Sequence, residues 1–232
     1  QEAGYSSGNI TLNTNSLGTF VLSQKEGGGG IGGYDDKMPT AWEETWGTGL
    51  ATGVNLAKGV GSSSNINWTS PSFSGAVLKL AYSGQNDGVS SNDKATSGDN
   101  SGAKGVGYDA VLDINAFGVN LFVGGSESNL DAGSTSKKRT SNHQEAVAGI
   151  TYALGPVKVG YQKTGEWFGS QLGGEVDYYD NMAWGVSFNI SDDLSISYGE
   201  FKSKKGYIGK SVSEGPTGWN TARDMDFMEA KS

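Results

Sequence analysis

The residues whose chemistry stands out are four acids in one glycine-rich segment. Asp35 and Asp36 follow a run of glycines, and Glu43 and Glu44 come shortly afterwards, between two tryptophans. Carboxylate oxygens are the ligands that calcium prefers, so these four acids could hold a structural Ca²⁺ ion. If the segment is instead an exposed glycine-rich loop, its acids only face solvent.

No set of residues in the sequence forms a catalytic centre. His143 is the single histidine and there are no cysteines, so a catalytic triad has no base and a zinc site has no ligand set. The polar neighbours of His143 predict a solvated loop residue. Asp192 and Asp193 fit a tight turn, where aspartate is favoured. The sequence therefore predicts that the protein is not an enzyme and carries no cofactor.

The composition narrows the class of partner. The net charge is −8, and the 17 lysines and arginines are scattered, which argues against nucleic acid as a partner. Ten tyrosines, eight phenylalanines and six tryptophans argue against a disordered polar chain. No apolar stretch reaches the roughly 18 residues of a transmembrane helix. If this chain meets a membrane, it must cross it with strands.

The elements that must position these residues are strands. Apolar and polar side chains alternate in segment after segment, as where Ile66 and Trp68 alternate with Asn65 and Asn67. This period predicts an all-β chain of about ten to eleven strands, each roughly 7–10 residues long, without a helix. The connections alternate between tight turns and long polar loops, which indicates an antiparallel up-and-down order. The long connections are expected at 25–64, 84–105, 126–143, 165–181 and 203–225.

Aromatic residues recur on the apolar strand faces, often near a strand end. Rings with an apolar body and a polar tip suit the boundary between membrane and water. In lipid, every backbone polar group needs a partner, so such a sheet would close into a barrel. A soluble β-sandwich with tyrosines at ordinary strand positions is the alternative. The aromatics expected at the membrane interface are Trp68, Tyr82, Tyr152, Tyr161, Trp184 and Tyr198.

One stretch carries a family resemblance. The sequence "NINWTSPSFSG" begins at Asn65, and Tyr82 and Ser83 close the strand that follows. Together with the preceding hairpin and long loop, this pattern resembles the Gram-negative general porins, particularly the alphaproteobacterial type. The resemblance covers nearly all of the chain, 1–232, as one segment of a barrel. It implies the middle of a sixteen-stranded transmembrane β-barrel and a homotrimer in the bacterial outer membrane.

The resemblance also implies a role for the acidic segment. In this family a long loop folds inward and narrows the pore, and 25–64 takes that position here. The constriction would hold Asp35, Asp36, Lys37, Glu43 and Glu44. Acidic rings of this kind favour cations in a pore. By alternation along the strands, the pore lining would include Lys79, Asp109, Asp113, Glu145 and Lys158.

The sequence thus predicts an outer-membrane porin, a water-filled channel for passive diffusion of small hydrophilic solutes and ions with a mild cation preference. Lys137, Lys138 and Arg139 form a small basic cluster that could touch lipopolysaccharide phosphates. The alternative is a soluble or surface-attached all-β binding domain, such as an adhesin, that uses its long loops to contact a ligand. Uncharged outward strand faces would favour the channel.

Overall fold

The computed structural model describes a curved antiparallel sheet with one short helix. The described residues are 8–24, 30–34, 37–39, 57–60, 64–84, 104–130, 142–168, 176–207 and 225–231. The strands are β1 (Gly8–Thr14), β2 (Gly18–Gln24), β3 (Asn65–Thr69), β4 (Ala76–Ser83), β5 (Lys104–Ala116), β6 (Val119–Leu130), β7 (His143–Leu154), β8 (Val157–Trp167), β9 (Val176–Ser191), β10 (Leu194–Tyr207) and β11 (Met225–Lys231).

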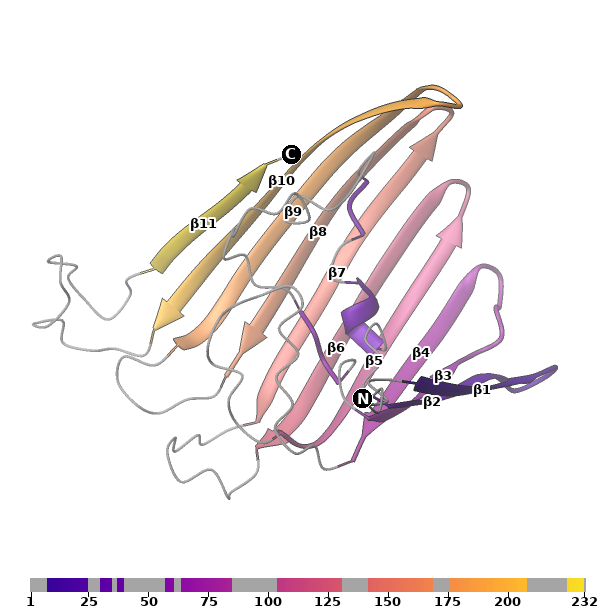
Figure 1. The fold of residues 1–232 in the computed structure, drawn as a ribbon, viewed down its shortest axis with the longest axis vertical. Helices are drawn as coiled ribbons and strands as arrows, with labels where there is room; N and C mark the ends of the chain where they lie inside the picture. The colour runs from indigo at the N-terminus through magenta and orange to yellow at the C-terminus, as the bar shows by residue number, and fades with distance from the viewer. Residues whose placement is uncertain are drawn as a thin grey trace, which may run out of the picture.

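Each strand pairs with the next one along the chain, so the eleven strands form one sheet in sequence order (Figure 1). All of these pairings are antiparallel. The prediction of an all-β, up-and-down antiparallel chain is therefore confirmed. The one helix among the described residues is the single-turn 3-10 helix η1 (Gly30–Tyr34). No helix in this part of the chain is long and apolar enough to cross a membrane.

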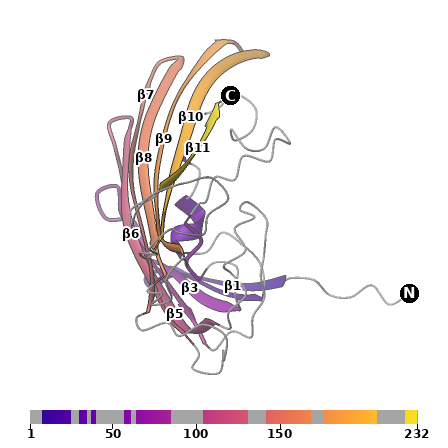
Figure 2. The same cartoon turned by 90° about the vertical axis from the view of Figure 1, so that its left-hand side faces the viewer.

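The sheet curves around the side on which η1 lies (Figure 2). We call this side the concave face and the opposite side the convex face. Successive side chains of a strand point to opposite faces, so the register assigns every described strand residue to one of them. Asp109 pairs with Ser126, and Ser126 with Glu145, all on the concave face. Ala110, which follows Asp109, pairs with Leu80 on the convex face.

Large apolar side chains cover much of the convex face and are exposed there. Large exposed apolar patches are typical of faces that contact a membrane or another protein. The apolar residues that recur at every second position of the sequence therefore form the convex face of the sheet. Its exposed members include Ile10, Leu12, Leu22, Ile66, Leu80, Leu112, Leu121, Val123, Ile150, Val159 and Ile196.

The later strands are longer than the expected 7–10 residues. β9 has 16 residues and β10 has 14. The long connections are correspondingly shorter than expected, because β6 continues to Leu130, β9 begins at Val176 and β10 continues to Tyr207. At the end of β6 the expectation failed because Ser126, Glu127 and Ser128 make this strand end polar on both faces. They keep their ladder partners after the apolar period has ended, as Ser126 does with both neighbouring strands.

Charged residues occupy the convex face near the long-loop ends of the strands. Lys163 forms an ion pair with Asp180 at 3.1 Å, and Lys202 forms one with Glu200 at 3.1 Å. The convex face therefore carries charge in one part, near the long-loop ends of the strands. The charges lie beyond the apolar belt, and each of these cations has an acid beside it.

The tight turn between β5 and β6 contains an unfavourable residue, and this leads to a prediction. Phe117 is fully exposed and has a φ of 53°, followed by Gly118 with a φ of 80°. A two-residue hairpin turn with both φ values positive favours Asn-Gly. We expect Phe117→Asn to raise the free energy of unfolding by about 1 kcal/mol, because asparagine tolerates this conformation better. Urea unfolding of the detergent-folded protein measures the change.

Phe73→Asn is the matched control for that variant. Phe73 is also exposed at a tight connection, but its φ is not positive. If both variants change stability equally, loss of an exposed ring explains the effect and the turn argument is wrong.

Candidate functional site on the concave face

Segments of the connection between β2 and β3 are hydrogen-bonded to the concave face. The Asp109 carboxylate accepts hydrogen bonds from the backbone N–H of Ile31 at 3.1 Å and of Val60 at 3.2 Å. Ile31 lies in η1 and Val60 lies where the chain returns towards β3. One buried carboxylate therefore holds both arms of the connection.

Two more side chains of the wall reach the same connection. The Oε2 atom of Glu145 accepts hydrogen bonds from the backbone N–H of Lys58 at 2.5 Å and of Gly59 at 2.9 Å. Gln162 donates from Nε2 to the Tyr34 carbonyl at 2.7 Å and accepts from the Lys37 N–H at 3.3 Å. Main-chain groups buried against the wall thus receive polar partners, which they require in a dry environment.

Apolar contacts complete this attachment. Ile31 and Tyr34 of η1 and Ala57 of the returning arm pack into one buried cluster with residues of the wall. The rings of Tyr34 and Phe122 lie 5.2 Å apart between centroids. The wall members of the cluster are Val111, Phe122 and Val147, which β5, β6 and β7 place on the concave face. The concave face is therefore partly a packed core.

Glycines allow the close approach between the connection and the wall. Gly30 has a φ of +57°, and a Cβ added there would collide with the Asp109 carboxylate. A Cβ at Gly32 would lie 2.7 Å from the Lys58 carbonyl oxygen. Gly30 and Gly32 therefore let η1 pack closely, and Gly30 has the left-handed conformation that glycine adopts readily.

The side chain of Tyr34 lies among charged groups. Its hydroxyl donates a 2.7 Å hydrogen bond to Asp113, and the Nζ atom of Lys79 lies 4.8 Å from its ring centroid. The Nζ atom of Lys37 lies 5.2 Å from the same centroid. Ammonium groups over an aromatic face at this distance are attracted to it. Burial raises the pKa of the Tyr34 hydroxyl, and the hydrogen bond to Asp113 and its negative charge raise that pKa further.

This arrangement predicts a dependence on alkaline pH. The raised pKa of Tyr34 means that its contribution is complete below about pH 10, the ordinary pKa of tyrosine, and declines above it. We expect the attachment of η1 to weaken as the pH rises above about 10, and Tyr34→Phe to lose that pH dependence. At neutral pH the variant should be less stable by about 1–3 kcal/mol, because a hydrogen bond to a charged acceptor is lost.

Phenolate absorbance and thermal unfolding, followed together against pH, measure both effects. Tyr161→Phe is the control, since Tyr161 is half exposed on the convex face away from the connection. Equal behaviour of the two variants would contradict the assignment to Tyr34.

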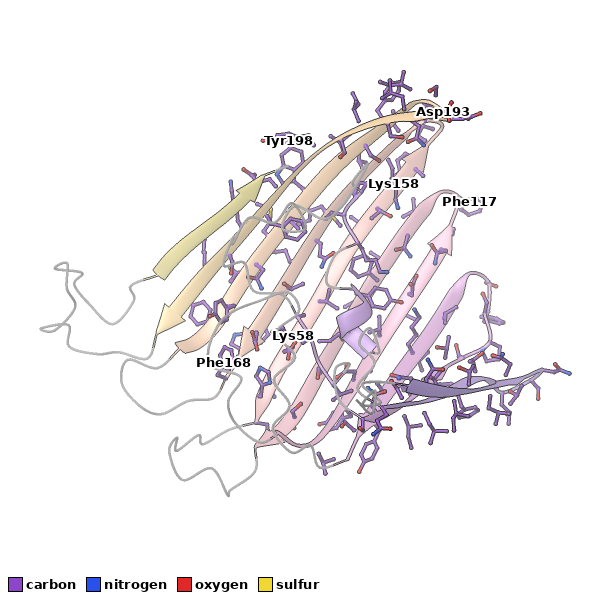
Figure 3. The ribbon with its side chains drawn as sticks, in the orientation of Figure 1. Lys58, Phe117, Lys158, Phe168, Asp193 and Tyr198 are labelled. Carbon is purple, nitrogen blue, oxygen red and sulfur yellow. The ribbon has the colours of Figure 1, made fainter. Side chains whose placement is uncertain are left out.

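The residues predicted to line a pore all lie on the concave face, in different environments. Asp109 and Glu145 are only 2% and 4% exposed, because they lie under the connection that they bind. Asp113 bonds Tyr34, and Lys79 lies over the same ring. Lys158 is exposed near the tight-turn end of β8 (Figure 3). Asp109 and Glu145 therefore anchor the connection instead of facing open solvent, and a pore-lining role for these five residues stays a prediction.

The expected constriction acids lie outside the described residues. Of that set, Lys37 is described, and its backbone N–H donates to Gln162. The calcium hypothesis and the narrowing role of the loop stay predictions. The unplaced members are Asp35, Asp36, Glu43 and Glu44.

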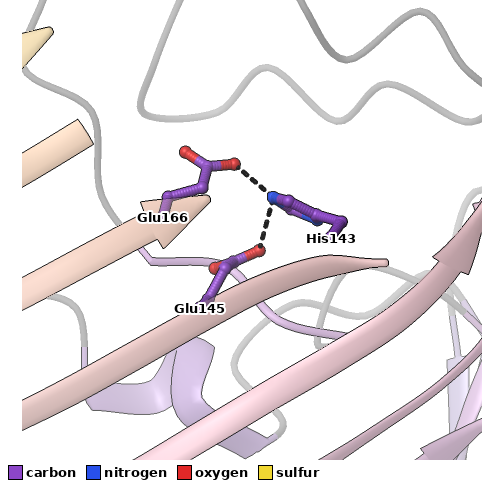
Figure 4. Close-up of side chains that lie close together, drawn as sticks. All are labelled: His143, Glu145 and Glu166. Atoms are coloured by element: carbon purple, nitrogen blue, oxygen red, sulfur yellow. Dashed lines mark hydrogen bonds and ion pairs between the residues drawn. The ribbon is translucent and has the colours of Figure 1, made fainter. Parts of the chain in front are cut away.

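The expectation for His143 was wrong. His143 is the first residue of β7 and is 3% exposed. Its Nε2 atom lies 2.8 Å from an oxygen of Glu166 and 3.7 Å from one of Glu145 (Figure 4). The polar residues before it indicated a loop, but β7 starts two residues earlier than its apolar period, and Phe168 stacks on the imidazole.

The aromatics predicted for a membrane interface lie on the convex face. Tyr82, Tyr152, Tyr161 and Tyr198 are exposed there. Trp68 donates from its indole N–H to the Leu17 carbonyl at 2.7 Å, and Trp184 donates to Glu200 at 2.9 Å. The two tryptophans thus have the apolar body and bonded polar tip that suit an interface. Contact of these residues with lipid stays a prediction.

Sequence reasoning missed several residues that make the site. Tyr34, Gln162 and Glu166 were not singled out, although each bonds a residue far away in the chain. The alternating period places Gln162 on the polar face of its strand with Lys158, and it could have placed Glu166 there in the same way. Nothing local could have shown their partners.

Comparison with known proteins identifies a solved structure with a similar arrangement of strands. No family model matches the chain, and no curated protein matches it in sequence. Among solved structures, the chain is similar to an anion-selective porin from Comamonas acidovorans, with a TM-score of 0.54. The match covers 97% of this chain and 75% of that one, at 12% sequence identity. The chain has a porin-like fold. The likeness at this identity concerns the arrangement of strands, which is the up-and-down sheet described above.

Proposed function

We propose that this chain forms part of the wall of an outer-membrane porin, a water-filled channel for passive diffusion of small hydrophilic solutes. The observation that carries the proposal is the chemical difference between the two faces of one curved sheet. The convex face exposes an apolar belt, whereas the concave face binds the polar connection between β2 and β3. We assign no catalytic activity to it.

The convex face supports a membrane location. Leu80, Leu121 and Ile150, on strands β4, β6 and β7, are each about half exposed, in a belt that would be costly in water. Lipid removes this cost and requires that backbone groups pair within a sheet. Tyr161 and Tyr198 lie towards the charged end of the belt, as interface aromatics do. We therefore place the belt in the hydrocarbon of a bacterial outer membrane.

The concave face supports a constricted channel. Asp109 and Glu145 tie both arms of the connection to the wall. A segment attached in this way inside a closed barrel would narrow the passage, so we propose that 25–64 is the constriction loop. Its acids Asp35, Asp36, Glu43 and Glu44, with the net charge of −8, would favour cations mildly. The similar porin of known structure is anion-selective, so the sign of selectivity rests on these acids alone.

The first test is electrical. The full-length protein in a planar bilayer should give single-channel openings, and a salt gradient should give a reversal potential on the cation side. Openings in groups of three would support the proposed homotrimer. The matched variant neutralises Asp35, Asp36, Glu43 and Glu44 together, which should move the reversal potential towards the anion side without abolishing conductance.

The outcomes separate the two parts of the proposal. An anion-side potential in the unmodified protein would refute cation preference and leave the channel standing. A well-folded protein that needs no detergent and never conducts would refute the channel and favour a soluble binding domain. We also propose that Lys137, Lys138 and Arg139 contact lipopolysaccharide phosphates, and binding of lipopolysaccharide to a variant lacking these charges tests it.

A further inference from the structure

We propose that His143, Glu145 and Glu166 form a binding site for a zinc-class divalent cation. The Nε2 atom of His143 faces the Oε1 atoms of both glutamates, at 3.7 Å from Glu145 and 2.8 Å from Glu166 (Figure 4). The possible ligand atoms all lie within 4.8 Å of one another. Three ligand atoms from two neighbouring strands therefore converge on one point.

The two separations from His143 suit a small ion, and the two glutamate oxygens lie within 4.8 Å of each other. Zinc binds histidine nitrogen and carboxylate oxygen at about 2.0–2.2 Å, so two tetrahedral ligands lie about 3.4 Å apart. The two measured separations lie on either side of this value. An imidazole nitrogen favours zinc and similar transition metals, whereas calcium and magnesium prefer oxygen ligands throughout. Three protein ligands would leave a position for water.

The surroundings hold each ligand in place. The imidazole of His143 stacks on Phe168 at 5.1 Å between centroids, and Phe168 packs edge-on against Tyr179. Glu145 uses its other oxygen, Oε2, for the N–H groups of Lys58 and Gly59. Metal ligands are commonly oriented by such outer contacts. All three ligands are at least nine-tenths buried, so water competes weakly for the ion.

The site would connect three parts of the chain. His143 begins β7, Glu166 lies near the end of β8, and Glu145 also binds the returning arm at Lys58 and Gly59. A bound ion would therefore join both strands at their long-loop ends and brace the side chain that anchors the connection. This proposal does not depend on the channel function, because it concerns binding by the folded chain.

The test uses the single histidine. The 232-residue chain, prepared without a polyhistidine tag and labelled with ¹⁵N-histidine, has one imidazole. On titration with zinc chloride we expect its Nε2 signal to shift and to saturate at one ion per chain. Calcium and magnesium chloride at the same concentration should leave the signal in place. An unchanged signal with millimolar zinc would overturn the proposal and leave a hydrogen-bonded network.

A variant and its control localise the ion. Glu166→Gln keeps the shape of the side chain and should weaken zinc binding by at least about 10- to 100-fold, the loss seen even for residues that only support a ligand. Glu127→Gln is the control, because Glu127 lies on the convex face and binds Asn142 and Gln144. Equal zinc affinity in the two variants would refute the site. Resistance of the Lys58–Gly59 bond to trypsin verifies that Glu166→Gln is folded.

Discussion

The double variant Asp109→Asn, Glu145→Gln should release the connection between β2 and β3 and raise single-channel conductance. The two carboxylates accept hydrogen bonds from the N–H groups of Ile31, Val60, Lys58 and Gly59. An amide of the same size has one acceptor oxygen fewer and turns an N–H₂ group towards these donors. A buried donor without an acceptor costs about 1–3 kcal/mol.

The expected size of this effect follows from the number of donors affected. Loss of two such bonds would lower the free energy of loop attachment by about 2–6 kcal/mol. Each 1.4 kcal/mol changes the attached-to-released ratio about tenfold, so released loops would become common. A released loop leaves the passage wider, and current per channel rises. The selectivity would fall at the same time, because the loop acids would move away from the path of the ions.

The measurement compares this variant with a matched control in the same bilayer. Asp192→Asn, Asp193→Asn removes the same charge from the exposed tight turn between β9 and β10. We expect its conductance to equal that of the unmodified protein. If both double variants conduct alike, general electrostatics would explain the result, and the anchoring role of Asp109 and Glu145 would be wrong.

Gly59→Ala should detach the returning arm through steric conflict, with all charges intact. Gly59 has a φ of +53°, and a Cβ added there would collide with the Asp109 carboxylate and lie 2.7 Å from a side-chain carbon of Ile31. The left-handed conformation costs about 1–2 kcal/mol for a residue with a Cβ. Overpacking a filled site adds about 1–3 kcal/mol. We expect trypsin to cut the chain after Lys58 much faster in this variant.

Gly155→Ala separates strain from collision. Gly155 has nearly the same φ, +56°, but no atom lies within 4 Å of its added Cβ. It lies in the tight turn between β7 and β8, so its variant has the backbone strain alone. Cleavage after Lys58 should stay slow. Fast cleavage in both variants would indicate general loss of stability, and the close fit of Gly59 on Asp109 would be refuted.

The sequence by itself determined the strands, their order and their two faces. The alternation of Leu78, Leu80 and Tyr82 with Lys79 and Ala81 is a local property, because successive side chains of a strand point to opposite sides. Tight turns alternating with long connections determined the up-and-down order in the same way.

Only the tertiary structure decided which side chains meet. Asp109 and Glu145 were assigned to the correct face, yet nothing local showed that a connection would bury them. Tyr34 meets Asp113 across 79 positions of the chain, and His143 meets Glu166 on a neighbouring strand. A local period specifies the face that a side chain occupies. Its partner depends on strand register and on where a distant segment folds back, and both are set by the packing of the whole sheet.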